Sequence, residues 1–393
     1  MSSNIFDKEK ELFLPTYNRI PLDIDYGEGV NLVDKQGNRY LDFFSGLAVN
    51  ALGYAHPKIV KAVSEQISKF AHLSNNYITD IQIEFTELLL KYSKMSKAFL
   101  TNSGTESVEG ALKLIRKKFG PEKRIFALKD SFHGRTYGAM SITGREKYRS
   151  GFEPLLPNIN HINFNDINDL EQKIDSNTAA VFLELIQGEG GINLVSEEFI
   201  SKINELKMKY NFVIVADEIQ SGIGRTGKPF AFNHYELKPD IVVAAKAIGG
   251  GLPLGAFLTS LELAGVFETG KHGTTFGGNP VSCAAGKVVL EEVFEFGLMN
   301  KVEELGSYFL NQLQELKKMF PNDIKDIRGK GFMIGIELNY ECVDIVRKMR
   351  EKKVLVNCTN KDVIRILPPL IAAKSDIDFF LFNLHEILKE KTH

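Results

Sequence analysis

Residues 239–256, PDIVVAAKAIGGGLPLGA, place Lys246 directly after an apolar run that is typical of a buried strand. A charged lysine is costly to bury, so at this position it needs a partner or a covalent use such as a Schiff base. A second apolar run, in residues 211–220 (NFVIVADEIQ), ends at Asp217. A buried carboxylate likewise needs a cation, and a protonated pyridine nitrogen is one. The two residues together suggest pyridoxal 5'-phosphate as a cofactor.

Two other interpretations of these residues stay open at this point. Lys246 alone also fits a strand-end lysine that extends its amine to the surface. Asp217, followed by residues 222–228 (GIGRTGK), resembles part of a nucleotide hydrolase. However, Pro229 stands where that loop needs a hydroxyl for magnesium, and no separate strand, loop and helix fit between the two motifs. The residues therefore favour the cofactor over a nucleotide.

Composition and charge limit the class of protein. The 393 residues include 48 Lys and Arg against 50 Asp and Glu, which leaves no net basic field for nucleic acid or a membrane surface. The N-terminus lacks an apolar signal core, and no apolar stretch approaches the roughly 18 residues of a spanning helix. We therefore expect a cytoplasmic protein. Cys283, Cys342 and Cys358 have no metal-binding spacing, so we expect no metal and three reduced cysteines that pack in the interior.

Helical patterns that alternate with short apolar runs predict an α/β fold. The expected strands are 98–101, 124–128, 180–186, 212–216, 241–245 and 255–260. Because these runs are apolar at nearly every position, we expect a mostly parallel sheet covered on both faces. We expect a helix over 196–210 and a long helical stretch over 279–319, broken near Gly297 and Asn300. A strand, a helix, two strands and a last helix should follow.

A phosphate site is predicted within residues 101–110 (TNSGTESVEG). The expected strand leads into Ser103, Gly104 and Thr105, and a helix follows. Small residues let backbone N–H groups close on a phosphate at the positive end of a helix. An ordinary serine-capped helix is the alternative. Gly110 inside this helix is locally unfavourable, and the sequence offers no account of it.

Several longer motifs occur in one order along the chain: LDFFSGLAVNALGYAHP (41–57), TNSGTES (101–107), SFHGRTYGAMSITG (131–144), LIQGEGG (185–191), VADEIQSGIGRTG (215–227), HGTTFGGNP (272–280) and VIRILPPL (363–370). With this ordered set the chain resembles the class III, fold type I aminotransferases that depend on pyridoxal phosphate, and most of all the members that act on N-acetylornithine. The resemblance implies a homodimer. It also implies a large cofactor domain with a seven-stranded sheet, over 56–290, and a smaller α/β domain from both chain ends, 1–55 and 291–393.

The resemblance assigns cofactor contacts residue by residue. Lys246 would form the Schiff base, Asp217 would hold the pyridine nitrogen and Gln220 would contact the ring 3'-oxygen. Both Lys246 and Asp217 would be catalytic, because the freed lysine amine can carry a proton and the carboxylate keeps the ring able to accept electrons. The remaining implied cofactor contacts are the phosphate cradle Ser103, Gly104 and Thr105, the ring-stacking Phe132 with its neighbour His133, and Thr275, which would reach the phosphate of the opposite subunit.

The resemblance also implies how two different amino donors share one pocket. Arg135 and Arg365 match the arginines that bind carboxylates, for which a planar guanidinium is well suited. Glu189 matches the residue that pairs with Arg365 and masks it from the first substrate. N-acetylornithine would give its δ-amine to 2-oxoglutarate, which yields N-acetylglutamate 5-semialdehyde and glutamate in arginine biosynthesis. An aminomutase or decarboxylase is disfavoured because neither needs a gate for a second substrate, and an intact set of cofactor residues disfavours a noncatalytic binding role.

The choice of amine depends on fewer residues. Ornithine aminotransferases carry a tyrosine where this chain has Leu47, which cannot bond a free α-amine and so favours an acylated one. N-succinylornithine and acylated lysine-pathway intermediates, together with ornithine itself, remain alternatives. Asn75 and Tyr77 stand in a segment that departs from the family pattern, and they are candidate contacts of the acyl group. Leu185, where a proline is usual, is expected to alter only the local backbone.

Overall fold

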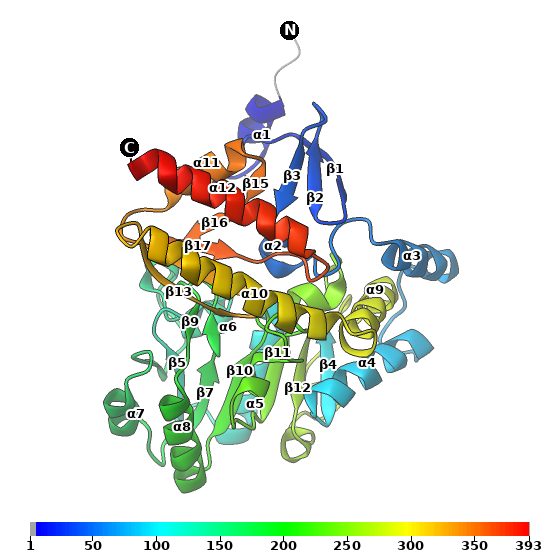
Figure 1. Ribbon diagram of the computed structural model, residues 1–393. Coiled ribbons are helices and arrows are strands. Elements are labelled where there is room, and N and C mark those ends of the chain that lie inside the picture. Colours follow the sequence, from blue (N-terminus) through cyan, green and yellow to red (C-terminus); the bar gives the residue numbers. More distant parts are fainter. Residues whose placement is uncertain (1–4, 393) are drawn as a thin grey trace.

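A seven-stranded sheet forms the centre of the molecule, which the computed structural model describes for residues 5–392 (Figure 1). In spatial order its strands are β4 (Lys97–Thr101), β12 (Gly255–Thr259), β11 (Ile241–Ala244), β10 (Val213–Asp217), β7 (Thr178–Leu183), β5 (Arg124–Leu128) and β6 (Ile159–Ile162). Strand β12 runs antiparallel to both of its neighbours, and all other neighbouring pairs are parallel. The predicted α/β fold with a mostly parallel sheet is confirmed, and β6 is a strand that the sequence did not reveal.

Both faces of this sheet are buried. Along β10, Val213 and Val215 belong to one hydrophobic cluster, whereas Ile214 and Ala216 belong to the other. Successive side chains of a strand point to opposite faces, so this alternation means that each face has its own core. The helices between the strands are α5 (Gly104–Phe119), α6 (Tyr137–Ile142), α7 (Ile167–Lys173) and α8 (Glu197–Tyr210). The predicted α8 is confirmed, and the Ser196 hydroxyl accepts a hydrogen bond from its first turn.

The two ends of the chain meet beside the large sheet (Figure 1). The N-terminal part contains α1 (Ile5–Leu12), β1 (Ile24–Glu28), β2 (Asn31–Asp34), β3 (Arg39–Asp42), α2 (Ser45–Ala48), α3 (Pro57–Lys69) and α4 (Asp80–Ser93). Strand β15 (Val354–Leu355) from the C-terminal part pairs in parallel with β3. The division into domains at 55/56 and 290/291 stays a prediction, and residues 1–4 of its first segment lie outside the described residues.

Up to residue 392, the C-terminal part contains five strands, β15 among them, where three were expected. Its elements are α9 (Pro280–Leu290), a π-helical turn (Glu291–Glu295), α10 (Leu298–Met319), β13 (Ile324–Lys330), β14 (Met333–Leu338), α11 (Val343–Glu351), β16 (Asn357–Thr359), β17 (Val363–Ile366) and α12 (Lys374–Thr392). The predicted helix break occurs at Gly297, which has φ +83, but Asn300 lies inside α10. The expected single strand before α11 is wrong, because a two-residue turn at Gly331 folds this segment into the hairpin β13–β14.

The predicted strand over 180–186 is also divided. Strand β7 ends at Leu183, and a short hairpin of β8 (Ile186–Gln187) and β9 (Asn193–Leu194) follows. Leu185 is fully buried, and its carbonyl accepts a hydrogen bond from the Val195 amide at 3.0 Å. The apolar run over 180–186 therefore continues past the end of β7, where the chain changes direction. Hydrophobic periodicity alone cannot reveal this change.

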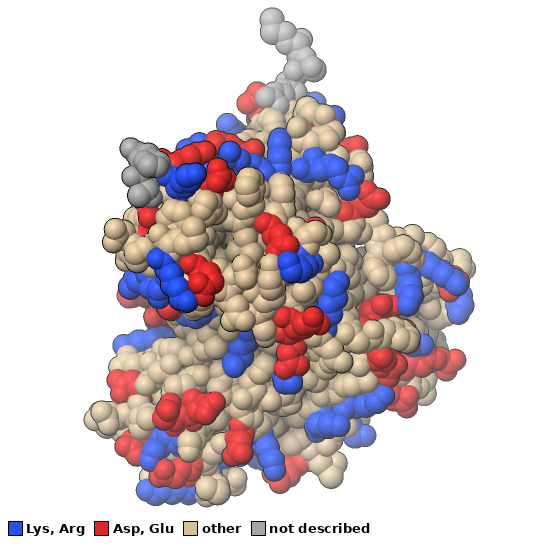
Figure 2. All heavy atoms as spheres, in the orientation of Figure 1, with Lys and Arg blue, Asp and Glu red and all other residues tan. Residues whose placement is uncertain are grey.

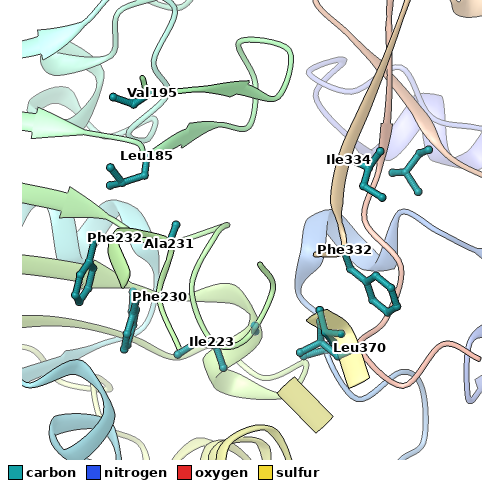
Figure 3. Close-up of a cluster of buried hydrophobic side chains, with 14 of the residues drawn as sticks. Leu185, Val195, Ile223, Phe230, Ala231, Phe232, Phe332, Ile334 and Leu370 are labelled. Carbon is teal, nitrogen blue, oxygen red and sulfur yellow. The ribbon is translucent and has the colours of Figure 1, made fainter. Parts of the chain in front are cut away.

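The cluster that contains Ile214 and Ala216 connects the large sheet with the C-terminal part (Figure 3). In Figure 3, Ile223 and Phe230 from the segment after β10 lie on one side, with Phe332 and Leu370 on the other. Each of these four side chains is at most 1% exposed. This shared core fixes the segment after β10 against the C-terminal strands.

The cysteines correct an expectation. Cys342 and Cys358 form a disulfide across a Cα–Cα distance of 5.8 Å, so the prediction that all three cysteines are reduced is wrong for these two. Sixteen residues separate them in sequence, and only the pairing of β16 with β17 brings Cys358 to the start of α11. Cys283 is a buried free cysteine, as expected.

Gly110 has a structural explanation that the sequence did not supply. A Cβ atom at this position of α5 would lie 2.3 Å from a ring carbon of Phe257 in β12. We therefore expect Gly110→Ala to lower the free energy of unfolding by about 1 kcal/mol, because overpacking costs more than the alanine gains in helix propensity. The midpoint of urea unfolding measures this change. In the double variant with Phe257→Leu, the cost attributable to alanine at position 110 should shrink; an undiminished cost would show that contact with the ring is not its cause.

The surface carries charges of both signs. Acidic and basic side chains are interspersed over the face shown in Figure 2, where neither sign dominates. Among the described residues, no helix is long and apolar enough to cross a membrane.

Candidate active site

A cavity of 470 Å³ lies at the carboxyl ends of the parallel strands, where ligands of α/β proteins usually bind. Its wall is built by the segments that follow β4, β5, β7, β10 and β11. The predicted site residues that line it are Ser103, Gly104, Thr105, Phe132, His133, Arg135, Glu189, Asp217, Gln220 and Lys246. The topology thus brings together residues from five separate segments.

Lys246 and Asp217 follow neighbouring strands. Asp217 is the last residue of β10 and pairs with Val243 of β11, three residues before Lys246. Lys246 begins a 3-10 turn (Lys246–Gly249) and has φ +53, a backbone conformation that is strained for a lysine. Burial, together with the charge of Arg365, lowers the pKa of the Lys246 amine to about 8. A neutral, nucleophilic amine is therefore accessible near physiological pH.

His133 holds the Asp217 carboxylate from behind. Its Nδ1 lies 2.7 Å from Asp217 Oδ2, and its side chain is fully buried. Burial alone would lower the pKa of His133, but the hydrogen bond and charge of Asp217 outweigh it and raise that pKa. The other carboxylate oxygen of Asp217 accepts the Ile219 amide at 3.1 Å. The carboxylate is thus fixed in orientation.

The start of α5 forms another part of the wall. Ser103 caps the helix by accepting a hydrogen bond from the Glu106 amide. The first amides of a helix have no partner within it, so the N–H groups of Gly104 and Thr105 are suited to a phosphate. A Cβ on Gly104 would lie 2.7 Å from Ile219, which shows how closely this turn packs against the segment after β10.

Arg135 is exposed at the cavity wall, and no ion pair of it with a carboxylate is found among residues 5–392. Its guanidinium carbon lies 4.0 Å from the ring centre of Tyr148 and 5.6 Å from that of Phe132. Cation–π contacts of this kind orient a guanidinium without occupying its N–H groups. Glu109 of α5 supports the same loop by accepting hydrogen bonds from Gly138 and Ala139.

Arg365 differs from Arg135 because a carboxylate already pairs with it. Its Nη1 lies 2.6 Å from Glu189 Oε1, and its side chain is 1% exposed. It also donates to Gly188 O at 3.0 Å and, through Nε, to Asn357 Oδ1 at 3.1 Å. Burial would raise the pKa of Glu189, but the charge and hydrogen bond of Arg365 lower it. The ion pair is therefore formed throughout the neutral pH range.

Four predicted site residues lie elsewhere. Leu47 is half-buried in α2 and has φ +66, but Val49 is the residue of this segment that lines the cavity. Tyr77 and Thr275 are exposed, and neither lines the cavity. The Asn75 amide donates hydrogen bonds to the carbonyls of Thr274 and Gly277, so it supports the loop that carries Thr275.

Sequence reasoning missed several residues around the site. Tyr148, Asn357, Arg145 and Thr359 contact predicted site residues. None stands in a motif that marks it, because each contact joins segments that are distant in sequence. The exception is Tyr148, an aromatic residue that follows Arg135 in the same stretch of sequence and so gives a weak local signal.

The comparisons with known proteins agree with this geometry. Residues 13–388 match the family model for class-III aminotransferases. The chain is a class-III aminotransferase. An acetylornithine aminotransferase of Aquifex aeolicus is 46% identical over 95% of this chain and 98% of its own length. One of Methanocaldococcus jannaschii is 42% identical, with 98% of each chain covered.

Solved structures place this class-III aminotransferase among the same enzymes. The ornithine aminotransferase of Toxoplasma gondii superposes with a TM-score of 0.94 at 29% identity, covering 99% of this chain and 95% of that one. The acetylornithine aminotransferase of Elizabethkingia anophelis gives 0.88 at 32% identity, with 98% of both chains covered. The shared fold therefore includes enzymes named for two different amines.

The cofactor of class-III aminotransferases is pyridoxal 5'-phosphate, and the residues present fit it. The cavity offers an amine with a lowered pKa in Lys246, a fixed carboxylate in Asp217 and a helix N-terminus at Gly104. These groups match the aldehyde, the ring nitrogen and the phosphate, respectively.

Proposed function

We propose that this aminotransferase moves the δ-amino group of N-acetylornithine to 2-oxoglutarate, as a step of arginine biosynthesis. The proposal is supported by the two arginines of the site: Arg135 lines the cavity and has no carboxylate partner among residues 5–392, whereas Arg365 lies behind the cavity wall and is paired with Glu189. A substrate with a single carboxylate needs only the first arginine, whereas glutamate and 2-oxoglutarate carry two carboxylates. The names of the relatives support the same pair of substrates.

The cofactor roles follow from the chemistry of each side chain. Pyridoxal phosphate, when bound, supplies an electron sink for the substrate carbon that loses a proton. Lys246 holds the cofactor and then carries the proton as general acid and base. Asp217, oriented by His133, keeps a positive charge on the ring nitrogen, and Gln220 binds the ring 3'-oxygen.

The other cofactor contacts complete the proposed site. Phe132, at the cavity wall, stacks on the ring, and the turn formed by Ser103, Gly104 and Thr105 binds the phosphate. Together with Lys246, these residues would hold the cofactor in the cavity.

The cavity wall near Val49 is apolar, which suits the acyl group of the proposed substrate. Val49 reaches the cavity from the segment that contains Leu47, and neither side chain can bond a free α-ammonium group. An unbonded ammonium group is costly to desolvate, whereas an acylated amine is not charged. This favours N-acetylornithine over ornithine. A substrate with heavy nitrogen at the δ-amine tests the reaction: the label should appear in glutamate, and a label that stays in the donor would contradict the proposal.

Glu189 should control which donor reacts. In Glu189→Gln, a neutral amide faces Arg365 and competes less well with a second substrate carboxylate. We expect the glutamate half-reaction to gain about tenfold relative to the N-acetylornithine half-reaction. Rapid-mixing measurements of the two half-reactions give this ratio, with the exposed Glu146→Gln as a control that should not change it. An unchanged ratio in Glu189→Gln would argue against the gate.

The enzyme is further proposed to act as a homodimer in which Thr275 reaches the partner's cofactor phosphate. Thr275 is exposed, and the neighbouring Phe276, Tyr77 and Ile78 are 59%, 66% and 84% exposed. An apolar surface of this kind is typical of an interface. The same surface would bring Asn75 and Tyr77 near the partner's substrate. Analytical ultracentrifugation tests this directly, since a monomer that is fully active would exclude a shared site.

The domain borders and the cellular location are also proposals. We place the domain borders at 55/56 and 290/291, and two separate transitions in calorimetric unfolding would support this division. Cytoplasmic location is proposed as well, and cell fractionation tests it. Disulfides such as Cys342–Cys358 are uncommon in the cytoplasm. Titration of free thiols in the enzyme isolated from cytosol shows whether this disulfide forms there.

A further inference from the structure

The backbone that carries Glu189 is fixed by side chains from other segments. Four successive carbonyls of the turn between β8 and β9 accept hydrogen bonds: Gly188 O from Arg365, Glu189 O from Arg145 and from Thr359, Gly190 O from Asn193, and Gly191 O from Arg328. A turn held at four successive carbonyls cannot swing as a unit without losing these bonds. The opening of the gate must therefore occur by rotation of the Glu189 side chain.

Such a rotation has an electrostatic cost. The Glu189 carboxylate is 23% exposed and loses its cation when a dicarboxylate substrate takes Arg365. A largely buried carboxylate without a partner is strongly destabilised. The open state therefore needs a second cation within reach of Glu189.

Arg145 is a cation in the required place. Its Nη1 donates to the backbone carbonyl of Glu189 itself, and its Nη2 donates to Asn360 Oδ1 at 3.1 Å. The residue is only 9% exposed, and no ion pair of it with a carboxylate is found within residues 5–392. Its charge contributes to the lowered pKa of Glu189, which is consistent with their proximity. The Arg145 guanidinium also lies over the Tyr148 ring, at 5.9 Å. A buried guanidinium whose contacts are neutral oxygens and a ring retains the capacity to bind a carboxylate.

We propose that Arg145 receives the Glu189 carboxylate when it leaves Arg365, and so stabilises the state of the pocket that admits dicarboxylate substrates. The proposal rests on the gate described under the proposed function. Arg145 is a positioning residue in this scheme, since it acts on substrate through Glu189. The two arginines would be alternative partners of one carboxylate, one for each class of substrate.

The proposal has a selective thermodynamic consequence. The apparent affinity for a ligand falls with the fraction of protein in the state that can bind it. Loss of Arg145 would lower the population of the open state and weaken the binding of dicarboxylates. N-acetylornithine binds with Glu189 still paired to Arg365, so its binding should not depend on Arg145.

The first experiment compares holoenzyme variants at position 145. In Arg145→Gln we expect glutarate, an unreactive dicarboxylate, to inhibit about tenfold more weakly, and glutamate to show an apparent dissociation constant raised to the same extent. The N-acetylornithine half-reaction should stay within about twofold of wild type. Lys147→Gln is the matched control, because Lys147 also lies over the Tyr148 ring, at 4.8 Å, but has no hydrogen bond to Glu189. Arg145→Lys keeps the charge and should restore most of the glutarate affinity.

A double variant separates this role from a merely structural one. In a Glu189→Gln background no carboxylate is left to transfer, so adding Arg145→Gln should cause no further loss of glutarate affinity. An equal loss in both backgrounds, or an equal loss for both half-reactions, would overturn the proposal. If Arg145→Gln does not fold, Arg145→Lys still tests the proposal. This variant keeps the charge, so a loss of glutarate affinity of about tenfold, with the N-acetylornithine half-reaction unchanged, would overturn the proposal. Failure of the gate itself appears separately, as an unchanged half-reaction ratio in the single variant Glu189→Gln.

Discussion

Alanine in place of Lys246 should leave a folded protein whose amino transfer is slower by about a thousandfold or more. The side chain has two proposed tasks, the covalent attachment of the cofactor and the transfer of a proton at the substrate carbon. Within residues 5–392, no other lysine lines the cavity. Single-turnover mixing with N-acetylornithine measures the rate, and the absorption spectrum shows whether the cofactor remains attached.

Lys228→Ala is the control for this variant. Lys228 lies in the segment after β10, but its side chain is 41% exposed and pairs with Glu303 at 3.0 Å. We expect it to retain wild-type activity. If Lys246→Ala kept more than about a tenth of the wild-type rate, Lys246 would be excluded from the chemistry, because general acid–base catalysis alone contributes at least about a hundredfold.

The replacement Asp217→Asn should have the second largest effect, a loss of about a hundredfold to a thousandfold in the rate of amino transfer. The amide removes the negative charge that faces the ring nitrogen and also the partner of the buried His133. The rate of the N-acetylornithine half-reaction measures the loss, while cofactor content should change much less, because the contacts of Lys246 and the α5 N-terminus remain.

A structural defect would give a different pattern. Because His133 draws its raised pKa from Asp217, a fall of that pKa in the variant, measured by nuclear magnetic resonance, would report the loss of the contact itself. A thermal midpoint close to that of wild type excludes unfolding as the cause of the lost rate. Wild-type activity in Asp217→Asn would contradict the role of the carboxylate.

The sequence predicted those parts of the molecule that depend on local patterns. Strands β10 and β11 follow from apolar runs, and α8 follows from Ser196 with acidic residues in the first turn. The pairing of Asp217 with Val243 brings the ends of both runs to one edge of the sheet, as is usual for parallel strands. These inferences needed only the period and the ends of each element.

Contacts between distant segments could not be predicted in the same way. His133 and Asp217 are 84 residues apart, and Arg145 and Asn360 are 215 residues apart. Nothing local in the sequence records that the turn at Glu189 lies between these segments. Gly110 is similar, since the reason for a glycine inside α5 is the Phe257 ring on another strand. Even the disulfide of the C-terminal part depended on strand pairing that the apolar pattern left undecided.

The preference of this enzyme for N-acetylornithine over ornithine can be measured on the holoenzyme. Holoenzyme is mixed rapidly with N-acetylornithine or with ornithine at matched concentrations, and the loss of the absorption band of the lysine-bound cofactor is followed. We expect loss at least about tenfold faster with N-acetylornithine, because the wall near Val49 offers no bond to a free α-ammonium group. Equal or faster loss with ornithine would contradict it.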